Sequence, residues 1–497
     1  MPPANIVFIH AESMDGRKMG CMGHPALKDA TPNLDQFAAE GVLFANAYSN
    51  CPVCNPSRAS MWTGKYPHYR DCWNNHEGLR DGVQTYQDAL HWSGYRTEAV
   101  GPIDYAYGKH SIRDRIGSWT RSAMIERPIV RTPLPQAVGI GQAHGVDWQH
   151  TWDAMRGIEA AALEGQPFCT YLTTGLVHPP FVAEQRHLDR IDAQAIDVPP
   201  LFGLEQTEHP AVRYQRIAKN CARAFSPMLV RQMRHVYFAM IAALDEMVGR
   251  VVQQIDELGL RDSTYIIFSS DHGEMAGEQN QVLKRCMYEA SAHVPLIICG
   301  PDVRRGAVVD EPVSLVDLYP TLMDMAGVSY QTLAERSGYA EQLDGESLMP
   351  QLTSAAPRQR AWAMAEYHGD RACTGTFMLR QERWKLIRHM GFASELYDLA
   401  EDPGEQRDLA ALQSDVVARL ESVLDAHFDC AEIDERAKAY DRASFLRWRA
   451  FAQAEGSYED TMAHVFSGYD RQSIEELELW TDRDEAQIEA WLARAPH

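Results

Sequence analysis

The chain has 497 residues, of which 45% are hydrophobic and 23% are charged. This composition is typical of a folded globular protein and excludes a largely disordered one, and the length is enough for about two to four domains. The formal net charge of −22 opposes the binding of nucleic acid and of anionic membranes to the average surface. An anionic substrate would therefore need a local basic pocket.

The segment from Met1 to Glu12 has neither the basic residues nor the long apolar run of a signal peptide, and it reads as a strand that starts near residue 5. No stretch approaches the roughly 18 consecutive apolar residues of a membrane-spanning helix. The cysteines are scattered, as expected for reduced and mostly buried thiols. We therefore expect a cytoplasmic protein with no membrane partner.

Segments typical of strands and of helices alternate through the first two-thirds of the chain. Amphipathic patterns predict helices at 230–258 and at 32–40, where Thr31 is the N-cap and Pro32 the first residue. Apolar runs predict strands at 5–10, 42–44, 168–173, 264–269 and 294–299. This alternation indicates an α/β fold with a large, mostly parallel sheet flanked by helices. Ligands of such sheets bind beyond the carboxyl ends of the strands.

A second region begins near residue 360. Short strands are predicted at 377–380 and 384–388, a turn-rich segment at 395–406, and charged helices from there to the C-terminus. The charged blocks from Glu475 to Glu489 are typical of a solvated helical surface, with a contact in a homo-oligomer as the alternative. We therefore expect one domain in residues 1–360 and a smaller C-terminal α+β region in residues 361–497.

Cys54 stands where a helix is predicted to begin, because Pro56 and a helix-compatible run follow it. The positive end of the helix dipole favours an anion there, and an unmodified cysteine would have a lowered pKa and could act as a nucleophile. Arg58, one turn further, offers a planar set of donors to a tetrahedral oxyanion. Cys51-x-x-Cys54 could also be a redox pair or half of a zinc site, but no second pair with matching spacing accompanies it.

Three residues with metal-binding side chains follow predicted strands. Asp271-His272 come directly after the strand at 264–269, and Glu12 follows the first strand. A buried acid without a partner is costly, so Glu12 is expected to meet a cation. Oxygen ligands suit Ca²⁺ or Mg²⁺, whereas the imidazole favours Mn²⁺. The sequence thus predicts a divalent metal site without deciding the ion.

Other basic side chains could complete an anion site. Lys284, together with Arg58, could supply the local positive charge that the acidic chain otherwise lacks. His178 follows the strand-like run at 168–173 and is expected at the same edge of the sheet. His110 and His209 are further candidates, although lone histidines are usually structural.

Residues 51–64 contain Cys54-Asn-Pro-Ser-Arg58 followed by Thr63-Gly64, and this pattern resembles the sequence at which sulfatases convert a cysteine into formylglycine. Nearly the whole chain resembles the type I sulfatases of the alkaline phosphatase superfamily, and most closely the arylsulfatase K group. The matching stretches are residues 50–64, 73–75, 105–121, 269–300, 314–322, 395–409 and 440–450.

The resemblance implies an alkaline-phosphatase-like fold and a formylglycine at position 54, made by a formylglycine-generating maturation enzyme. It also implies one divalent metal ion, Ca²⁺ or Mn²⁺, held by residue 54 with Glu12, Asp271 and His272. The anion contacts that it implies are Arg58, Lys284 and His178.

Two departures from the family pattern concern the anion pocket. The family usually has an aspartate, often with a second carboxylate beside it, where this chain has Glu12-Ser13. Its usual Gly-Lys pair is Gly101-Pro102 here, so that Lys109 or His110 could compensate for the missing lysine, or the pocket could accept other esters. Phosphonate monoester hydrolases also lack that lysine, and an asparagine placed like Asn75 contacts their substrate.

The expected activity is hydrolysis of a sulfate monoester, either an aryl sulfate or a sulfated sugar or uronate. The hydrated aldehyde at position 54 would attack sulfur, with His178 or Lys284 protonating the leaving alcohol and His110 accepting a proton when sulfate leaves. The alternative is a phosphonate monoester or phosphodiester hydrolase with the same nucleophile. A non-catalytic protein on this fold would be expected to have lost Cys54 or the metal ligands. The expected partner is a small anionic ester as substrate, which Asn75, His209 and Lys109 would contact. The wall of the substrate pocket is expected to include His76, Tyr367 and His368.

Overall fold

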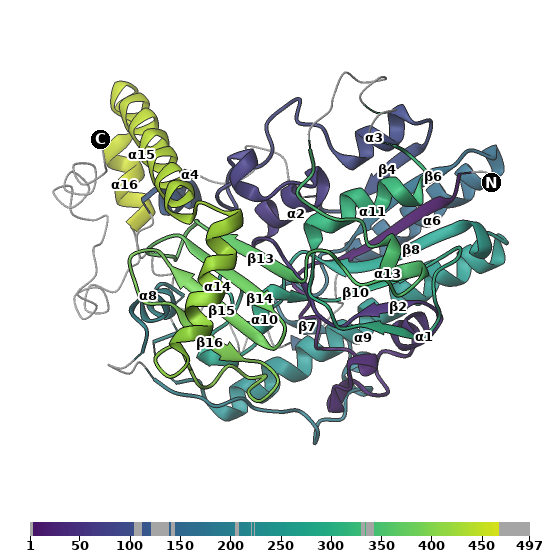
Figure 1. Ribbon diagram of the computed structural model, residues 1–497, viewed down its shortest axis with the longest axis horizontal. Helices are drawn as coiled ribbons and strands as arrows, with labels where there is room; N and C mark the ends of the chain where they lie inside the picture. The colour runs from purple at the N-terminus through teal and green to yellow at the C-terminus, as the bar shows by residue number, and fades with distance from the viewer. Residues whose placement is uncertain are drawn as a thin grey trace.

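The computed structural model describes residues 3–103, 112–120, 139–140, 145–203, 208–219, 221–222, 224–329, 333 and 342–466. A seven-stranded sheet runs through the larger part of the molecule (Figure 1), in the order β11-β2-β10-β8-β1-β6-β4. In this order the strands are β11 (Ala307–Val309), β2 (Val42–Phe44), β10 (Leu296–Cys299), β8 (Thr264–Ser270), β1 (Asn5–Ala11), β6 (Phe168–Thr173) and β4 (Arg96–Val100).

The inner strands of the sheet are buried on both faces because helices cover each face, whereas the edge strand β4 is only half-buried. In the central strand β1, Val7 and Ile9 pack into one core, and Ile6 and Phe8 pack into the other. The first core includes residues of α1 (Pro32–Glu40), α6 (Gly145–Glu164), α7 (Gln185–Leu188) and α9 (Pro227–Glu257). The second includes residues of α2 (Cys54–Thr63), α3 (Tyr86–Trp92), α11 (Leu318–Met325) and α13 (Met349–Thr353). The continuous apolar runs that predicted the strands are therefore explained by burial on two sides.

The predicted large and mostly parallel sheet is confirmed, with one strand reversed. The pairs β8–β1, β1–β6 and β6–β4 are parallel, whereas β10 is antiparallel to both β8 and β2. The single strand predicted at 294–299 is divided at Pro295, whose nitrogen has no hydrogen to donate to a ladder. The residues before it form β9 (His293–Val294), which joins β3 (Ala47–Tyr48) and β12 (Val313–Ser314) in a small second sheet.

A four-stranded antiparallel sheet lies beside the large sheet (Figure 1). It comprises β13 (Trp362–Tyr367), β14 (Thr376–Gln381), β15 (Trp384–His389) and β16 (Glu395–Asp398), so that both strands predicted in this region are confirmed. The segment predicted as turn-rich begins with β16, because Leu396 pairs with Leu386 and both are buried. The domain division at residue 360 stays a prediction.

Helices complete the C-terminal part of the chain. α14 (Ser414–His427) packs on β14 and β15, and α15 (Cys430–Ala454) contacts α16 (Tyr458–Phe466) and, from a distant part of the sequence, α4 (Ile112–Thr120) (Figure 1). Among the described residues, the remaining α-helices and strands are α8 (Pro210–Ala218), α10 (Glu289–Ala292), β5 (Gly139–Ile140) and β7 (Val182–Ala183). The charged blocks of residues 475–489 lie outside the described residues.

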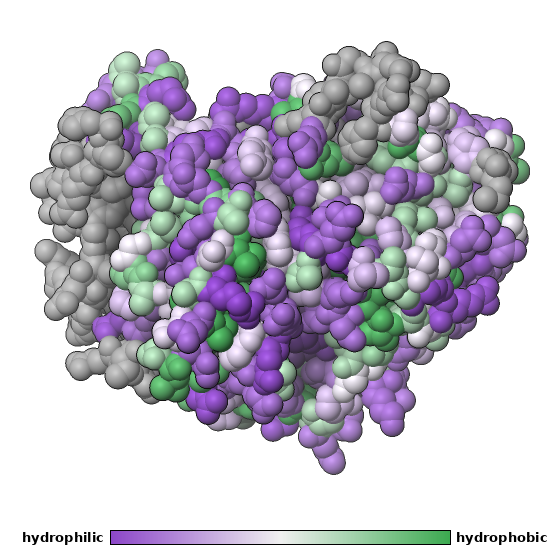
Figure 2. Space-filling model, viewed as in Figure 1, coloured by the Kyte–Doolittle hydropathy of each residue, from purple (hydrophilic) through white to green (hydrophobic). Residues whose placement is uncertain are grey.

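The surface is mainly hydrophilic on the face shown in Figure 2, where hydrophobic residues occur in small separate groups. Among the helices that the structure describes, none combines the length and the apolar character needed to cross a membrane.

Candidate active site

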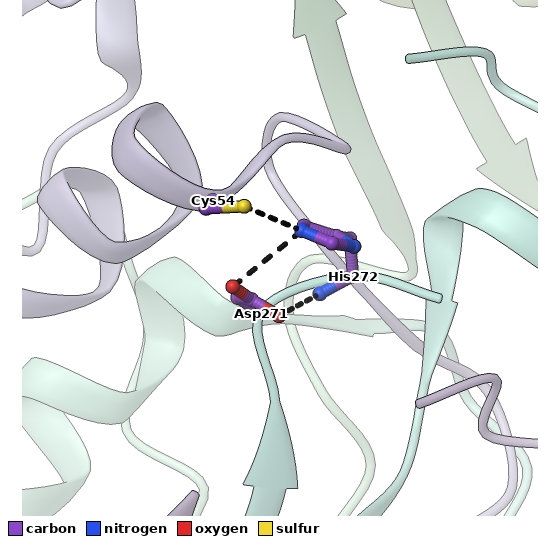
Figure 3. Close-up of side chains that lie close together, drawn as sticks. All are labelled: Cys54, Asp271 and His272. Carbon is purple, nitrogen blue, oxygen red and sulfur yellow. Dashed lines mark hydrogen bonds and ion pairs between the residues drawn. The ribbon is translucent and has the colours of Figure 1, made fainter. Parts of the chain in front are cut away.

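The predicted site residues meet at the carboxyl ends of three neighbouring parallel strands. Glu12 follows β1, Asp271 and His272 follow β8, and Thr173 ends β6. Because Ala11 of β1 pairs with Ser270 of β8, the residues that come next on the two strands stand at the same level of the sheet. Cys54 reaches them from the first turn of α2 (Figure 3). The register of the sheet therefore brings together residues that lie more than 200 positions apart in the chain.

The N-terminus of α2 is tied to this edge of the sheet by polar side chains. The backbone N–H of Asn55, one of the unpaired donors of the first helical turn, donates to Asn75 Oδ1 at 2.8 Å. Ser57 Oγ donates to the carbonyl oxygen of Asp271 at 2.6 Å and lies 3.1 Å from Ser49 Oγ. Asn75, predicted to contact substrate, thus holds the helix start, and its predicted substrate contact stays a prediction.

Cys54, Glu12, Asp271 and His272 form a buried cluster. Cys54 Sγ lies 3.3 Å from His272 Nε2 and 3.4 Å from Glu12 Oε1. His272 Nε2 lies 3.5 Å from Asp271 Oδ2 (Figure 3). His272 Nδ1 is 2.9 Å from the carbonyl oxygen of Gly273, which can only accept, so Nδ1 carries the proton. The lone pair of Nε2 is therefore directed into the cluster.

Burial decides the charges within this cluster. It lowers the pKa of His272 to about 3, so that the imidazole is neutral. Burial also raises the pKa of Glu12. For Asp271 burial acts in the same direction, but the charge of His272, in the acidic range where this imidazole is protonated, and the charge of Arg58 outweigh burial and hold the pKa of Asp271 below its usual range. The site thus combines an ionised carboxylate, a second carboxyl group that a cation would favour in its ionised form, and a free imidazole nitrogen.

The thiol of Cys54 differs from the expectation for a cysteine at a helix start. Its pKa is raised, not lowered, because burial disfavours the thiolate and the charges of Glu12 and Asp271 add to this effect. The helix dipole is too weak to compensate for complete burial beside two carboxyl groups. The prediction of a lowered pKa for an unmodified Cys54 is therefore wrong, and a thiol with a raised pKa is a poor nucleophile at neutral pH.

Arg58 is fully buried and uses most of its donors within the protein. Its Nε donates to Asp271 Oδ2 at 3.1 Å. Its Nη1 donates to the carbonyl oxygens of Pro102 and Ile103, the latter at 3.1 Å. Nη2 has no hydrogen-bond partner among the described residues, although it lies 3.6 Å from Glu12 Oε2. One guanidinium nitrogen therefore stays available to an anion beside Cys54.

Lys284 and His178 complete the surroundings of Cys54. Lys284 is buried, and its positive charge contributes to the pKa values of Cys54, Glu12 and His178. His178 Nε2 lies 3.8 Å from Glu12 Oε1, and Nδ1 donates to the carbonyl oxygen of Pro179 at 2.6 Å. Burial, assisted by Lys284, lowers the pKa of His178 to about 3. His178 is thus neutral, with an unprotonated Nε2.

The donor set fits a divalent cation. Ligand atoms of Cys54, Asp271 and His272 all lie within 4.8 Å of one another, and Glu12 Oε1 reaches the same thiol. Two buried carboxyl groups with a neutral imidazole would be stabilised by a cation between them. Cys54 Sγ stands where an oxygen of a formylglycine would lie.

His209 is not brought into this cluster. It caps α8, where Nδ1 accepts the N–H of Ala211 at 3.2 Å and Nε2 lies 2.9 Å from the carbonyl oxygen of Ala393. Its ring stacks on His389, which in turn contacts Glu395 Oε2 at 2.8 Å. Both of its nitrogens thus have hydrogen-bond partners at the end of the C-terminal sheet, and its predicted substrate contact stays a prediction. The predictions for Lys109 and His110 lie outside the described residues.

Comparisons with known proteins identify the family. A family model described as Sulfatase matches residues 4–328, and one described as N-sulphoglucosamine sulphohydrolase, C-terminal, matches residues 277–428. Arylsulfatase K of Danio rerio is 34% identical over 507 residues, which cover 96% of this chain and 94% of that protein. The chain belongs to the sulfatase family. Arylsulfatase K of Bos taurus is 33% identical to this sulfatase over 475 residues, covering 90% of this chain and 85% of that protein.

Solved structures share the fold of this sulfatase. One, a complex with its substrate D-glucosamine-2-N,6-O-disulfate, has a TM-score of 0.68 at 21% identity and covers 85% of this chain and 97% of that one. The phosphonate monoester hydrolase of Agrobacterium radiobacter has a TM-score of 0.68 at 23% identity and covers 87% of this chain and 96% of that one. These likenesses confirm the predicted fold class, and the family identifies a sulfuric ester hydrolase that acts on an anionic ester.

His10 lies beside the site but was not among the residues predicted from the sequence. His10 is fully buried in β1, with Nδ1 3.3 Å from Thr173 Oγ1 and with Nε2 lacking a hydrogen-bond partner among the described residues. Burial and the charge of Arg58 lower the pKa of His10 to about 3. A polar residue at the end of an otherwise apolar strand, two positions before Glu12, was the available signal.

Proposed function

We propose that this sulfatase hydrolyses the sulfate monoester of a sulfated sugar and that Cys54 acts after conversion to formylglycine. The observation that carries the proposal is the position of Cys54 in the first turn of α2, with its buried Sγ 3.3 Å from His272 Nε2 and 3.4 Å from Glu12 Oε1 among residues that fit a divalent cation. Burial raises the pKa of this thiol, which makes the unmodified cysteine a poor nucleophile. The sugar is supported by the structural neighbour that binds a glucosamine disulfate and by the family model of the C-terminal region.

The chain's own residues have distinct tasks in this proposal. Arg58 Nη2 and the ammonium group of Lys284 bind the sulfate oxygens and stabilise the charge that develops on them. Lys284 also protonates the leaving alcohol, because a neutral His178 with an unprotonated Nε2 can accept a proton but cannot donate one. His178, whose unprotonated Nε2 lies 3.8 Å from Glu12 Oε1 beside Cys54, is the candidate to accept a proton when sulfate leaves.

Glu12, Asp271 and His272 would hold a divalent metal together with residue 54. The metal and the aldehyde hydrate would supply an acidified hydroxyl as nucleophile and a second hydroxyl whose deprotonation releases sulfate. Oxygen donors with one imidazole favour Ca²⁺ or Mn²⁺. The maturation enzyme, a homo-oligomer and a cytoplasmic location stay predictions.

Mass analysis of the peptide that contains Cys54 tests the modification. Protein produced together with a maturation enzyme should carry an aldehyde in place of the thiol, and C54A should hydrolyse neither p-nitrophenyl sulfate nor a sulfated sugar. C299A is the matched control, since Cys299 is an equally buried thiol in β10. An active preparation whose residue 54 is entirely unmodified would contradict the proposal.

A phosphonate or phosphate diester is the second candidate substrate. Pro102 stands where the family has a lysine, and its carbonyl oxygen accepts a hydrogen bond from Arg58 Nη1, so the site has one positive charge fewer. Comparing kcat/KM for p-nitrophenyl sulfate with kcat/KM for a phenylphosphonate ester distinguishes the two. A preference for the phosphonate would replace the sulfate proposal while leaving the nucleophile unchanged.

A further inference from the structure

Lys284 stands between two residues with strained backbone conformations. Leu283 has a φ of 64° and Arg285 a φ of 79°, in the left-handed region that residues with bulky side chains rarely adopt. Such conformations persist only where the surrounding structure holds them, and they cluster at functional sites. The turn formed by residues 283–285 therefore requires specific contacts on both sides of Lys284.

Glu274 makes the contact on one side. Its Oε1 accepts the N–H of Leu283 at 2.5 Å and the N–H of Ala276 at 3.2 Å, which closes the base of the loop that begins at Met275. The N–H of Met275 also donates to the carbonyl oxygen of Leu283 at 2.8 Å. The residue immediately before Lys284 is thus fixed to the segment that follows the metal ligand His272.

The segment that leads to Cys54 makes the contact on the other side. The N–H of Arg285 donates to the carbonyl oxygen of Pro52 at 2.9 Å, and Arg285 Nε donates to Asp370 Oδ1 at 3.2 Å. Hydrogen bonds therefore hold the turn to Glu274 on one side and to Pro52, two residues before Cys54, on the other. A shift of either support would move Lys284 relative to residue 54.

The environment of Glu274 is unusual for a purely structural residue. Its side chain is 1% exposed, and Oε2 is buried without a hydrogen-bond partner among the described residues. The positive charges of Lys284 and Lys219 both act on this carboxyl group. A buried polar atom without a partner requires an explanation, and the positive charges of Lys284 and Lys219, which favour the ionised carboxylate, provide one.

We propose that Glu274 is a positioning residue that fixes the turn of residues 283–285 and thereby directs Lys284 at the ester. The inference rests on the proposed role of Lys284 and extends it, because Glu274 does not contact substrate and acts through Lys284 alone. Misplacement of a catalytic group by about 1 Å can cost on the order of a hundredfold in rate.

A double-mutant cycle tests the inference. E274A should lower kcat/KM on the order of a hundredfold, and E274Q should recover most of that loss, because an amide oxygen can accept the same two N–H groups. The variant E274A/K284A should be no slower than K284A. The inference would be overturned if kcat/KM of the double variant fell by the product of the two losses that E274A and K284A cause separately. If E274A does not fold, E274D takes its place, since the shorter side chain of aspartate cannot reach Leu283. Wild-type activity of E274D would equally overturn the inference.

The control is D245A. Asp245 is also a buried carboxylate, and it accepts the N–H of Leu34 at 2.8 Å, between α9 and α1. D245A should lower the melting temperature without the change in kcat/KM that E274A produces. Equal effects of the two variants on kcat/KM would show that Glu274 only supports the fold.

A second measurement does not depend on the substrate. Hydrogen exchange of the Leu283 amide should be faster in E274A than in the wild type, and unchanged exchange would overturn the inference. The kinetic cycle is run with whichever ester the wild-type enzyme hydrolyses. Failure of sulfate turnover would thus count against the proposed function, while the exchange rate still decides the role of Glu274.

Discussion

Replacing Arg58 by lysine keeps a positive charge beside the nucleophile but removes the planar set of donors. In the structure Nε binds Asp271 Oδ2 at 3.1 Å, Nη1 binds two carbonyl oxygens, and Nη2 is left for the anion. These contacts point in different directions from one buried group, and a single ammonium group can keep only one of them. R58K therefore keeps at most one of the three anchoring bonds and loses the other two together with the donor that faces the substrate.

The magnitudes follow from the contacts. Two hydrogen bonds from a charged donor are worth about 1.5–3 kcal/mol each, so R58K should destabilise the protein by roughly 3 kcal/mol after relaxation. Loss of a donor to the developing oxyanion typically costs about 10²–10³ in kcat. We therefore expect a lower melting temperature and a kcat reduced by about that factor, measured with p-nitrophenyl sulfate on protein whose modification at residue 54 has been verified.

The control is R358K. Arg358 is also buried, and it binds Asp317 Oδ2 at 2.9 Å and the carbonyl oxygen of Arg360 at 3.1 Å. R358K should lower the melting temperature as R58K does but leave kcat near the wild-type value. A wild-type kcat for R58K would refute the role of the Arg58 donors in catalysis, and equal losses of kcat in both variants would assign the effect to folding.

Three further outcomes are expected. N75A removes the acceptor for the first turn of α2 and should lower the free energy of unfolding by about 1 kcal/mol. N75D keeps the acceptor but repels the anionic substrate, so its KM should rise. A wild-type KM for N75D would contradict this expectation. In metal-free protein, burial raises the pKa of Glu12 above 4.5. Above pH 4.5 the folded state therefore retains a proton that the unfolded chain releases. The contribution of this proton to the free energy of unfolding falls as the pH rises towards the raised pKa. Melting temperatures of chelator-treated wild type and E12Q across this range should differ in slope, and identical slopes would refute the shift. K385M removes the buried ammonium group that lies 2.9 Å from Glu289 Oε1 and 2.7 Å from Glu405 Oε1, and it should destabilise the protein by about 3–5 kcal/mol in a denaturant titration; a variant as stable as the wild type would show that the ion pairs contribute no net stability.

Local patterns predicted most of the elements that carry the site. The apolar runs of β1 and β8 were readable because burial on both faces requires them, and the start of α2 at Cys54 followed from Pro56. The interruption at Pro295 of the strand predicted at 294–299 and the short β16 were not predicted, since pairing with distant residues, not local preference, decides where such strands begin and end.

The residues of the site could be predicted from the sequence, but the charges that their side chains carry could not. The sequence by itself determined the family pattern around Cys54, the metal-binding side chains after two strands, and the need for a local positive charge in an acidic chain. Only the tertiary structure decided that burial raises the pKa of the Cys54 thiol, that His178 is neutral and that one nitrogen of Arg58 has no hydrogen bond among the described residues. It also decided that Glu274 holds the strained turn around Lys284. The physical reason is that the pKa of a side chain and the strain of a backbone depend on burial and on charges contributed by strands far apart in sequence, which local patterns do not encode.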